Sequence, residues 1–326
     1  MRLLVLGGTM MVGRKVAELA ISSGHEVLCA ARGLSGQVPE GARLIPIDRD
    51  HPESMEALRG ERFDAVVDVA QFSVNWVRQA LGVLAPTTDH WTFVSSVSVY
   101  ADTRTRGQTT DSPVHEPGED GVEFTPEQYG RVKVASELAV REAMDDRAFV
   151  VRPGLITGEG DHHDRYGYWP NRLCNGGQVV IPDTGMPVQS VDNEDLGRFI
   201  VHAARHRLAG TFDAVSEPRP MREEFDEIAE LVAPADTEFV PMSSDALVAA
   251  GVNPWTGDRS LPLWVPAEYD GLMAHDAASA YEAGLVTRPF AEKIDAVLAQ
   301  ERLLGVDRAR KAGLSADQEA ELLRTV

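Results

Sequence analysis

Residues 1–16 read MRLLVLGGTMMVGRKV, and this stretch decides the fold. A continuous apolar run at residues 3–6 ends in Gly-Gly-Thr, which is typical of a buried parallel strand that enters a tight turn. Apolar side chains then recur at helical spacing until Ser23 and Gly24 end the helix. A second apolar run follows at residues 27–31. The opening of the chain therefore predicts a β-α-β unit.

The same alternation continues downstream. Further strands are predicted at 43–47, 65–70, 92–95 and 148–151, with helices at 55–58, 77–84 and 125–144 between them. Such alternation predicts an α/β protein with a Rossmann-type, doubly wound parallel sheet and helices on both faces. We expect a first domain over residues 1–158 and a smaller lobe over 159–326, with some later segments returning to the first domain. A final helix is predicted at 312–326, opened by Ser315.

Composition excludes several kinds of partner. The 326 residues include 31 basic and 51 acidic ones, which leaves a formal net charge of −20. A field of this sign repels phosphates and anionic lipid, so we expect no nucleic-acid partner and no membrane. Cys29 and Cys174 have no metal-ligand spacing and imply no disulfide framework. Because no apolar stretch reaches the length of a membrane span or a signal segment, we expect a cytoplasmic protein.

The turn after the first strand has the spacing of a dinucleotide site. Gly7 and Gly13 occupy the first and third positions of G-x-x-G-x-x-G. Small residues there let backbone amides at a helix N-terminus approach a pyrophosphate. Met10 stands at the middle glycine position, so its side chain must point away from the phosphates. The alternative interpretation is a tight turn with only a structural role.

The end of the second strand normally distinguishes NAD from NADP. An acidic residue there accepts from a ribose hydroxyl, whereas an arginine pairs with a 2′-phosphate. This chain has Arg32 and no acid, with Arg14 opening the first helix nearby, so NADP is favoured and NAD remains possible. The alternative for Arg32 is a solvated surface side chain. Asp48, after the third strand, either accepts from the adenine amino group or caps the following turn.

A tyrosine, a lysine and a serine form the candidate reaction centre. Tyr129 and Lys133 are four residues apart on one helical face. A free phenol has a pKa of about 10, which a neighbouring ammonium lowers so that the phenol can exchange a proton with a carbonyl oxygen. Ser96 follows the fifth strand, where parallel sheets present functional groups, and its hydroxyl can bond the same oxygen.

These stretches resemble a known family. GGTMMVGR, SSVSVY, YGRVK, RPGLITG and PVQSVDNEDL are similar to motifs of the extended short-chain dehydrogenases/reductases, in the NAD-dependent epimerase/dehydratase branch. The resemblance covers nearly the whole chain. It implies an NAD(P)-binding Rossmann domain, a substrate-binding C-terminal lobe and an enzyme that acts on a small molecule. Homodimers are common in this fold, so a homodimer is possible.

Roles carry over by motif. The resemblance implies that Ser96 is the catalytic hydroxyl and Tyr129 the acid/base, while Lys133 tunes the phenol and holds the nicotinamide ribose. Pro153 would lie near the nicotinamide. The cofactor-binding residues expected in full are Gly7, Thr9, Met10, Met11, Gly13, Arg14, Arg32, Asp48, Ala70, Lys133 and Pro153.

The departures from the family pattern narrow the range of substrates and reactions that we expect. Members that act on nucleotide sugars usually have Asn where Leu155 stands, and an Arg-Asp pair where residues 187–190 read PVQS. A diphosphate needs such donors, so a nucleotide sugar is disfavoured. Dehydratases usually have Asp-Glu after the catalytic hydroxyl, whereas Val97 and Ser98 follow here, so dehydration is disfavoured as well.

The loop after residue 158 contains the sequence DHHDRYGYW. Asp161 and Asp164 flank two histidines, but adjacent histidines in one loop rarely converge on one ion without a distant ligand, so we expect no metal site. The interpretations left open for the rest of the loop are a substrate wall and a packed or mobile crossover. The residues concerned are Arg165, Tyr166, Tyr168 and Trp169. Trp255 and Trp264 are expected to be core or interface anchors, and Arg172 and Arg198 to be surface or structural residues.

Three functions remain open at this point. The first is an NADP(H)-dependent reductase or dehydrogenase of a small ketone, alcohol or imine, with Tyr129 handling the proton. The second is an epimerase that retains its cofactor and returns the hydride to the opposite face. The third is a non-catalytic, cofactor-binding sensor, which the retention of both Tyr129 and Lys133 disfavours.

Overall fold

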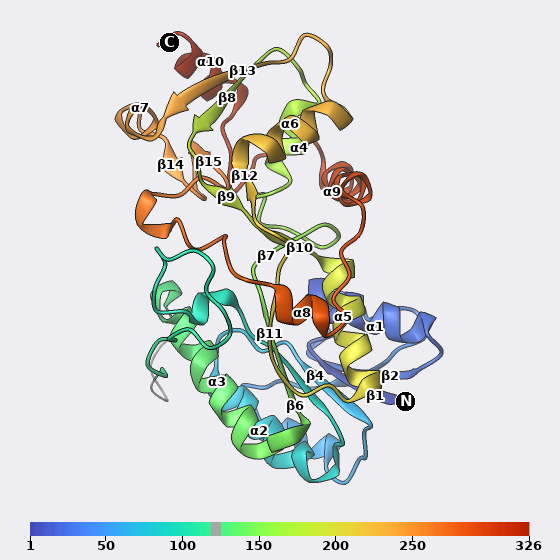
Figure 1. Cartoon of the computed structure of the whole chain (residues 1–326). Helices are drawn as coiled ribbons and strands as arrows, with labels where there is room; N and C mark the ends of the chain where they lie inside the picture. The colour runs from blue at the N-terminus through green and yellow to red at the C-terminus, as the bar shows by residue number, and fades with distance from the viewer. Residues whose placement is uncertain (119–124, 326) are drawn as a thin grey trace.

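The computed structural model describes residues 1–118 and 125–325, and within them a seven-stranded parallel sheet forms the centre of the first domain (Figure 1). The strands lie in the order β11-β6-β5-β4-β1-β2-β3. Their bounds are β1 Arg2–Leu6, β2 Glu26–Ala31, β3 Arg43–Pro46, β4 Ala65–Asp68, β5 Trp91–Val94, β6 Ala148–Pro153 and β11 Gly210–Ala214. The Rossmann-type α/β fold predicted from the sequence is confirmed.

Strand β1 occupies the middle of the sheet because its unbroken apolar run suits a strand buried on both faces. Leu4 is fully buried and pairs with Leu28 of β2 on one side and with Val66 of β4 on the other. From β1 the chain adds β2 and β3 on one side of the sheet, and from β4 it adds β5, β6 and β11 on the other side, so the strand order reverses between β1 and β4. In open parallel sheets, ligands bind outside the carboxyl ends of the strands at such a reversal. The topology therefore places a crevice beside the glycine turn.

Helices cover both faces of the sheet (Figure 1). On one face, the apolar stripes of α1 (Met11–Ser22) and α5 (Asn193–His206) pack against each other and the strands, with α8 (Ala278–Glu282) beside β11. Gly197 allows the close approach of the two long helices, since a Cβ there would lie 2.8 Å from Leu19. The other face carries α2 (Val74–Leu84) and α3 (Tyr129–Met144).

A second hydrophobic core builds the C-terminal lobe, at the top of Figure 1. Its middle is the Trp169 ring, 4.1 Å from that of Phe225 and shielded from solvent. The lobe's helices are α4 Tyr168–Leu173, α6 Met221–Val232, α7 Ser244–Ala249, α9 Phe290–Leu304 and α10 Ala316–Leu323. Its strands are β8 Gln178–Asp183 with β13 Glu238–Ser243, β9 Pro187–Val188 with β12 Arg219–Pro220, and β14 Asn253–Pro254 with β15 Ser260–Leu261.

Between the domain and the lobe, β7 (Leu155–Thr157) pairs with β10 (Ser190–Asp192). After β10 the chain returns to the first domain, where α5 and β11 complete the Rossmann unit. It returns there once more with α8, which packs beside β11. The sheet of that unit therefore takes its edge strand from a part of the sequence beyond residue 158.

Several predicted boundaries need correction. The opening of the final helix by Ser315 is confirmed, but residues 312–314 lie outside the helix, which spans Ala316–Leu323. The Ser315 hydroxyl accepts from the Gln318 amide at 3.2 Å, and the Gln318 side chain accepts from the Ser315 amide at 2.8 Å. The helix predicted from residue 125 opens as a 3-10 turn at Pro126–Gln128. The short helix predicted at 55–58 is a 3-10 segment, Pro52–Leu58.

The aromatic run of the loop at 161–169 is packed rather than exposed. Tyr166, Tyr168 and Trp169 are each at most 2% exposed and belong to the core of the lobe. Of the two interpretations left open by the sequence, a packed crossover fits these three rings. Trp264 is a core residue, as expected, and Arg172 is structural, since it pairs with Glu319 at 2.5 Å.

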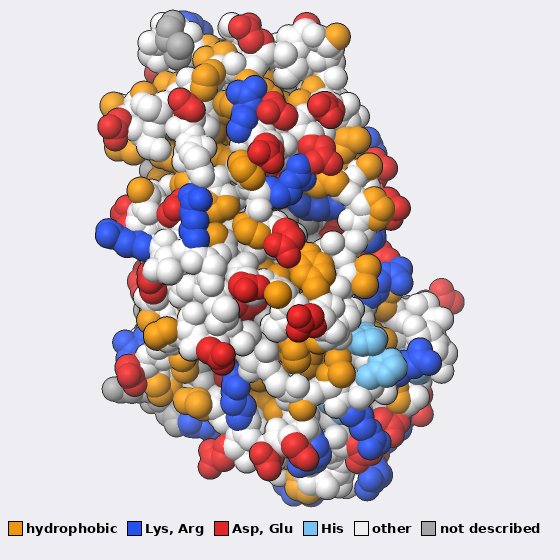
Figure 2. Space-filling view, in the orientation of Figure 1, with side chains coloured by type: hydrophobic (Ala, Val, Ile, Leu, Met, Phe, Trp, Pro, Cys, Tyr) orange, Lys and Arg blue, Asp and Glu red, His pale blue; other side chains and the backbone are white. Residues whose placement is uncertain are grey.

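The surface mixes charges of both signs. On the face in Figure 2, Lys and Arg side chains are interspersed with Asp and Glu, with no continuous basic patch. In the described part of the chain, no helix combines the length and apolar character needed to cross a membrane.

Candidate active site

The turn after β1 has a backbone that requires glycine at three positions. Gly7 has a φ of +106°, in the region that L side chains rarely adopt. A Cβ on Gly13 would lie 2.5 Å from the Gly7 carbonyl oxygen, and one on Gly8 would lie 2.4 Å from the Cys29 sulfur. The close packing leaves the first amides of α1 next to the end of β1. Such a cradle fits a pyrophosphate at a helix N-terminus.

Methionine at the middle glycine position is accommodated without blocking this cradle. Met10 has an extended backbone, with a φ of −139°, and its side chain is 46% exposed. Met11 carries the local strain, with a φ of +32°. The departure from the glycine pattern thus leaves the turn intact.

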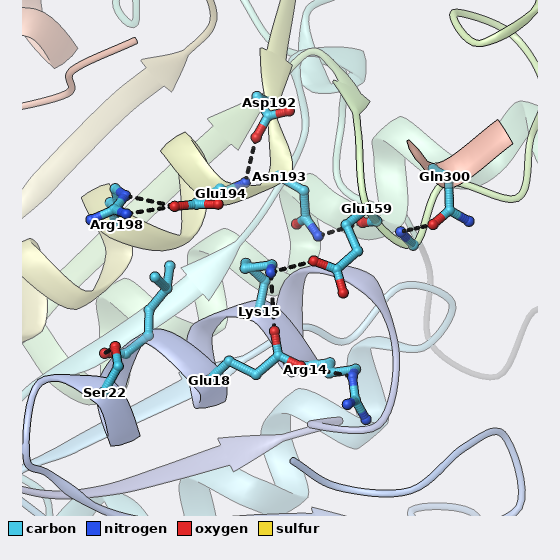
Figure 3. A network of polar contacts seen from close by, with 12 residues as sticks. Arg14, Lys15, Glu18, Ser22, Glu159, Asp192, Asn193, Glu194, Arg198 and Gln300 are labelled. Atoms are coloured by element: carbon cyan, nitrogen blue, oxygen red, sulfur yellow. Dashed lines mark hydrogen bonds and ion pairs between the residues drawn. The ribbon is translucent and has the colours of Figure 1, made fainter. Parts of the chain in front are cut away.

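A network of polar contacts fastens this turn to the loop after β7 (Figure 3). The Lys15 ammonium pairs with Glu159 at 2.5 Å and with Glu18 at 3.0 Å. The Asn193 side chain donates to the Glu159 carbonyl at 2.8 Å, and the Gln300 side chain accepts from the Gly160 amide at 3.1 Å. The loop that leads to Asp161 is therefore tied to α1, α5 and α9 at once.

The residues expected to bind the adenosine half of the cofactor lie around β2 and β3. Arg32 directly follows β2 and is exposed. Arg14 is already engaged, since its guanidinium donates to the Gln37 carbonyl at 2.6 Å and pairs with Glu18 at 2.9 Å. The Asp48 carboxylate accepts from the Asp50 amide at 3.1 Å, which is the turn-capping role considered for it.

Lys133 is buried between the ends of two strands. Its ammonium donates to the Ala70 carbonyl at 2.6 Å and to the Val94 carbonyl at 2.7 Å. It also lies 4.9 Å from the centre of the Phe93 ring and 5.7 Å from that of Tyr129. Because burial penalises the charged form, the pKa of Lys133 falls to about 7. Ala70, expected among the cofactor contacts, is thus a direct partner of Lys133.

Tyr129 and Ser96 meet because α3 starts very close to the end of β5. Tyr129 is the first residue of α3, and Gly130 lets this helix approach the 3-10 turn Val97–Val99: a Cβ on Gly130 would lie 2.0 Å from the Ser98 carbonyl oxygen. The Ser96 hydroxyl also bonds that of Ser98 at 3.1 Å. A glycine after the tyrosine is therefore a geometric requirement of the site.

Two cations lie near the Tyr129 phenol: Lys133, whose ammonium is 5.7 Å from the centre of the ring, and Arg165, whose charge acts on the hydroxyl. Burial raises the pKa of Tyr129 above its ordinary value, while hydrogen bonding with Ser96 and the charge of Arg165 lower it. Lys133, which the sequence assigned to this task, also donates to two backbone carbonyls, and its role toward the phenol stays a prediction. Sequence reasoning placed Arg165 only in a candidate substrate wall, because no spacing rule connects its loop with α3.

Two buried ion pairs beside the site were missed by the sequence analysis. Asp68, at the end of β4, is fully buried, and its carboxylate accepts hydrogen bonds from both Arg49 Nη atoms, at 2.7 and 2.8 Å. The carboxylate of Glu137, one turn after Lys133, accepts hydrogen bonds from Nε and Nη2 of Arg152, at 2.9 and 2.8 Å. An acid inside an otherwise apolar strand was the available signal for the first pair, because a buried carboxylate needs a partner.

The remaining expected residues lie as follows. Pro153 ends β6 and is buried, paired with Ala214 of β11. Leu155 begins β7 and is 6% exposed, so the asparagine position of nucleotide-sugar enzymes holds a buried apolar side chain. Around Asp161, as elsewhere in residues 1–118 and 125–325, no cluster of three metal-ligating side chains is present.

Comparison with known proteins agrees with this fold. The sequence profile of the NAD dependent epimerase/dehydratase family matches residues 3–214. A 2'-dehydrokanamycin reductase of Streptomyces kanamyceticus is 31% identical over 199 residues, which cover 57% of this chain and 52% of that protein. This chain therefore spans about half the length of that relative.

Solved structures share the fold. The UDP-glucose 4-epimerase of Thermotoga maritima, determined with UDP-glucose, matches with a TM-score of 0.66 and 17% identity, covering 93% of this chain and 99% of that one. The UDP-glucose 4-epimerase of Thermus thermophilus, in complex with NAD, matches with a TM-score of 0.62 and 19% identity at the same coverage. The chain belongs to the NAD dependent epimerase/dehydratase family, among the extended short-chain dehydrogenases/reductases.

Proposed function

We propose that the protein is an NADP(H)-dependent reductase or dehydrogenase that interconverts a small carbonyl or imine compound and its alcohol or amine. The observation that carries the proposal is the meeting of Ser96 and Tyr129 at the end of β5, with Lys133 buried one turn further along α3. The relative named as a reductase supports reduction over epimerisation.

The residues present suit proton transfer to a carbonyl oxygen. When bound, the nicotinamide supplies or accepts the hydride. Ser96 donates a hydrogen bond to the substrate oxygen and orients it. Tyr129 donates its phenolic proton to the same oxygen, and because burial raises its pKa, the phenol stays protonated at neutral pH. This protonation state favours the reductive direction.

Lys133 and Arg32 have the roles that cofactor binding requires. Lys133 holds the strand ends together through Ala70 and Val94, and it is the side chain that would reach the nicotinamide ribose. Arg32 is exposed at the end of β2 and would pair with a 2′-phosphate, which is why we propose NADP rather than NAD. The substrate would bind beside Ser96 and Tyr129, at the carboxyl end of β5.

We further propose a homodimer formed through α2 and α3. Leu138 on α3 is 51% exposed and lines a surface hollow together with Ala135 and Ala139 of the same helix, and apolar side chains gathered on one surface are typical of interaction sites. A cytoplasmic location, with Cys29 and Cys174 kept as free thiols, is part of the same proposal.

Replacing the phenol tests the proposal. In Tyr129→Phe, we expect NADPH oxidation with a panel of ketones to fall at least about 100-fold, since general acid catalysis contributes about 10²–10⁴ in rate. NADPH affinity, measured by fluorescence, should stay within about twofold of wild type. Full activity would remove Tyr129 from the mechanism. Turnover without net change in nicotinamide absorbance, with cofactor retained, would indicate an epimerase instead.

A further inference from the structure

Arg165 is a partly buried cation with unused hydrogen-bonding capacity. It lies in the loop between β7 and α4, and its guanidinium carbon is 5.2 Å from the centre of the Trp255 ring. Its Nε is buried and has no hydrogen-bond partner within residues 1–118 and 125–325. Buried donors normally have partners, so the unpaired Nε indicates a side chain that is not held by the protein's own acceptors and can bind a group that arrives from outside the chain.

The position of Arg165 relates it to the proposed reaction centre. Its charge acts on Asp161, His163 and Tyr129, but the described residues contain no ion pair of Arg165. The loop that carries Arg165 packs against the glycine turn, since a Cβ on Gly160 would lie 3.1 Å from the Met11 Cα. From there the charge of Arg165 acts on the Tyr129 phenol. A molecule bound against Tyr129 would therefore lie in the field of this guanidinium.

The loop that carries Arg165 is fixed in place rather than free to swing away. Asp164, immediately before it, adopts a φ of +63°, pairs with Arg308 and accepts from the Lys311 amide at 2.8 Å. At the other end of the loop, the Gln300 side chain bonds both the Gly160 amide and the Asp161 carbonyl. Figure 3 shows the same Gln300 together with the Glu159 anchor. Arg165 is therefore preorganised, which reduces the cost of using it for binding.

We propose that Arg165 is a specificity-determining residue whose guanidinium donates hydrogen bonds to an oxygen substituent near the reacting carbonyl of the substrate. The substrates selected are then oxygen-rich ketones, hydroxylated or carboxylated, and plain hydrocarbon ketones are rejected because they leave the guanidinium unpaired. This inference rests on the proposed function, since it assigns the substrate class of the same site.

Three cyclic ketones test the inference: cyclohexanone, 2-hydroxycyclohexanone and 3-oxocyclohexanecarboxylate. For the wild type we expect kcat/KM with NADPH to be about 10- to 100-fold higher for an oxygen-bearing ketone than for cyclohexanone, the range expected when a charged donor is left unpaired. In Arg165→Met this preference should shrink to about threefold or less. Whether the hydroxyl or the carboxylate compound is preferred identifies the substituent.

The matched control is Arg198→Met, because Arg198 is an exposed arginine on α5 whose partner is Glu194, one turn away. It should keep both the stability and the preference of the wild type. Arg165→Lys, which retains the charge but not the planar fork, should keep only part of the preference. Retention of the full preference in Arg165→Met overturns the inference and leaves the proposed reductase intact.

If no ketone is reduced, a binding measurement distinguishes a failure of the proposed reductase function from a failure of the proposed role of Arg165. The affinity of each ketone for the protein saturated with NADP⁺ is measured by calorimetry, which requires no reaction. Selective binding of the oxygen-bearing ketones by the wild type, lost in Arg165→Met, supports the inference even if no ketone is reduced. Equal binding of all three ketones by both proteins overturns it.

Discussion

Gly130→Ala is the substitution that most sharply tests the geometry of the site. An alanine Cβ at this position would lie 2.0 Å from the Ser98 carbonyl oxygen and 3.0 Å from the His115 ring, whereas real Cβ contacts essentially never fall below 3.0 Å. The start of α3 must therefore move away from the end of β5 by about 1 Å or more. Because Tyr129 is the neighbouring residue, the same displacement separates its hydroxyl from Ser96.

Two effects of opposite sign act on stability. Alanine is favoured over glycine inside a helix by about 1 kcal/mol, but overpacking against a rigid backbone costs about 1–3 kcal/mol or more. We expect a net loss of about 1–2 kcal/mol in the free energy of unfolding, measured with urea. A displacement of about 1 Å at a reacting group costs about 100-fold in rate, so kcat with NADPH should fall by that order.

Gly82→Ala is the matched control. Gly82 lies within α2, and a Cβ there would meet no atom within 4 Å. It should raise the free energy of unfolding by about 0.5–1 kcal/mol and leave kcat unchanged. If Gly130→Ala were as active as the wild type and no less stable than Gly82→Ala, the close approach of α3 to β5 would not be a feature of the working enzyme.

Two further predictions concern charge. Arg32→Ala should weaken NADPH binding about tenfold and leave NADH binding unchanged, because it removes one charge-assisted contact at an exposed site; a fluorescence titration checks this, and an equal loss for both cofactors would contradict the role of Arg32. Lys133, whose pKa is about 7 in the folded protein and about 10.4 in an unfolded chain, binds fewer protons folded than unfolded between these values. The free energy of unfolding should therefore rise with pH above about 7 by up to about 1.4 kcal/mol per unit from this group. Lys133→Met removes that contribution, so parallel stability curves for the two proteins from pH 7 to 9 would show that Lys133 is not buried as described.

The Rossmann fold and the approach of Tyr129 to Ser96 could be predicted because local patterns determine them. An apolar run followed by Gly-Gly-Thr already defines β1 and its turn, and the spacing of Tyr129 and Lys133 places both on one helix. The serine at the end of β5 follows from the parallel order of the strands. These inferences need only short-range periodicity and the handedness of β-α-β units.

The side-chain packing of the C-terminal lobe could not be predicted from the sequence, for a physical reason. Tyr166, Tyr168 and Trp169 form an aromatic run without helical or alternating period, so their sequence does not say whether they face a cavity or a core. The orientation of Arg165 depends on distant anchors, among them Gln300 and Arg308. Contacts separated by more than a hundred residues leave no local signature.

The same limit explains why the charge of Arg165 near the phenol was not predicted. A tyrosine and a lysine one helical turn apart suggest a pair, but the two carbonyls that hold Lys133 follow β4 and end β5, far away in sequence. The charge of Arg165 reaches Tyr129 from a loop of the lobe. The full set of charges around the phenol is therefore decided by tertiary packing, and the motif predicts only the phenol and the lysine one turn away.

A crystal structure of the complex with NADP⁺ measures the central claim most directly. We predict the pyrophosphate against the amides after Gly7, the 2′-phosphate at Arg32, and the nicotinamide ring within contact of Tyr129 and Ser96. Lys133 would exchange one of its backbone partners for the ribose. A nicotinamide bound away from Tyr129, or a phosphate that does not meet the glycine turn, would contradict the account.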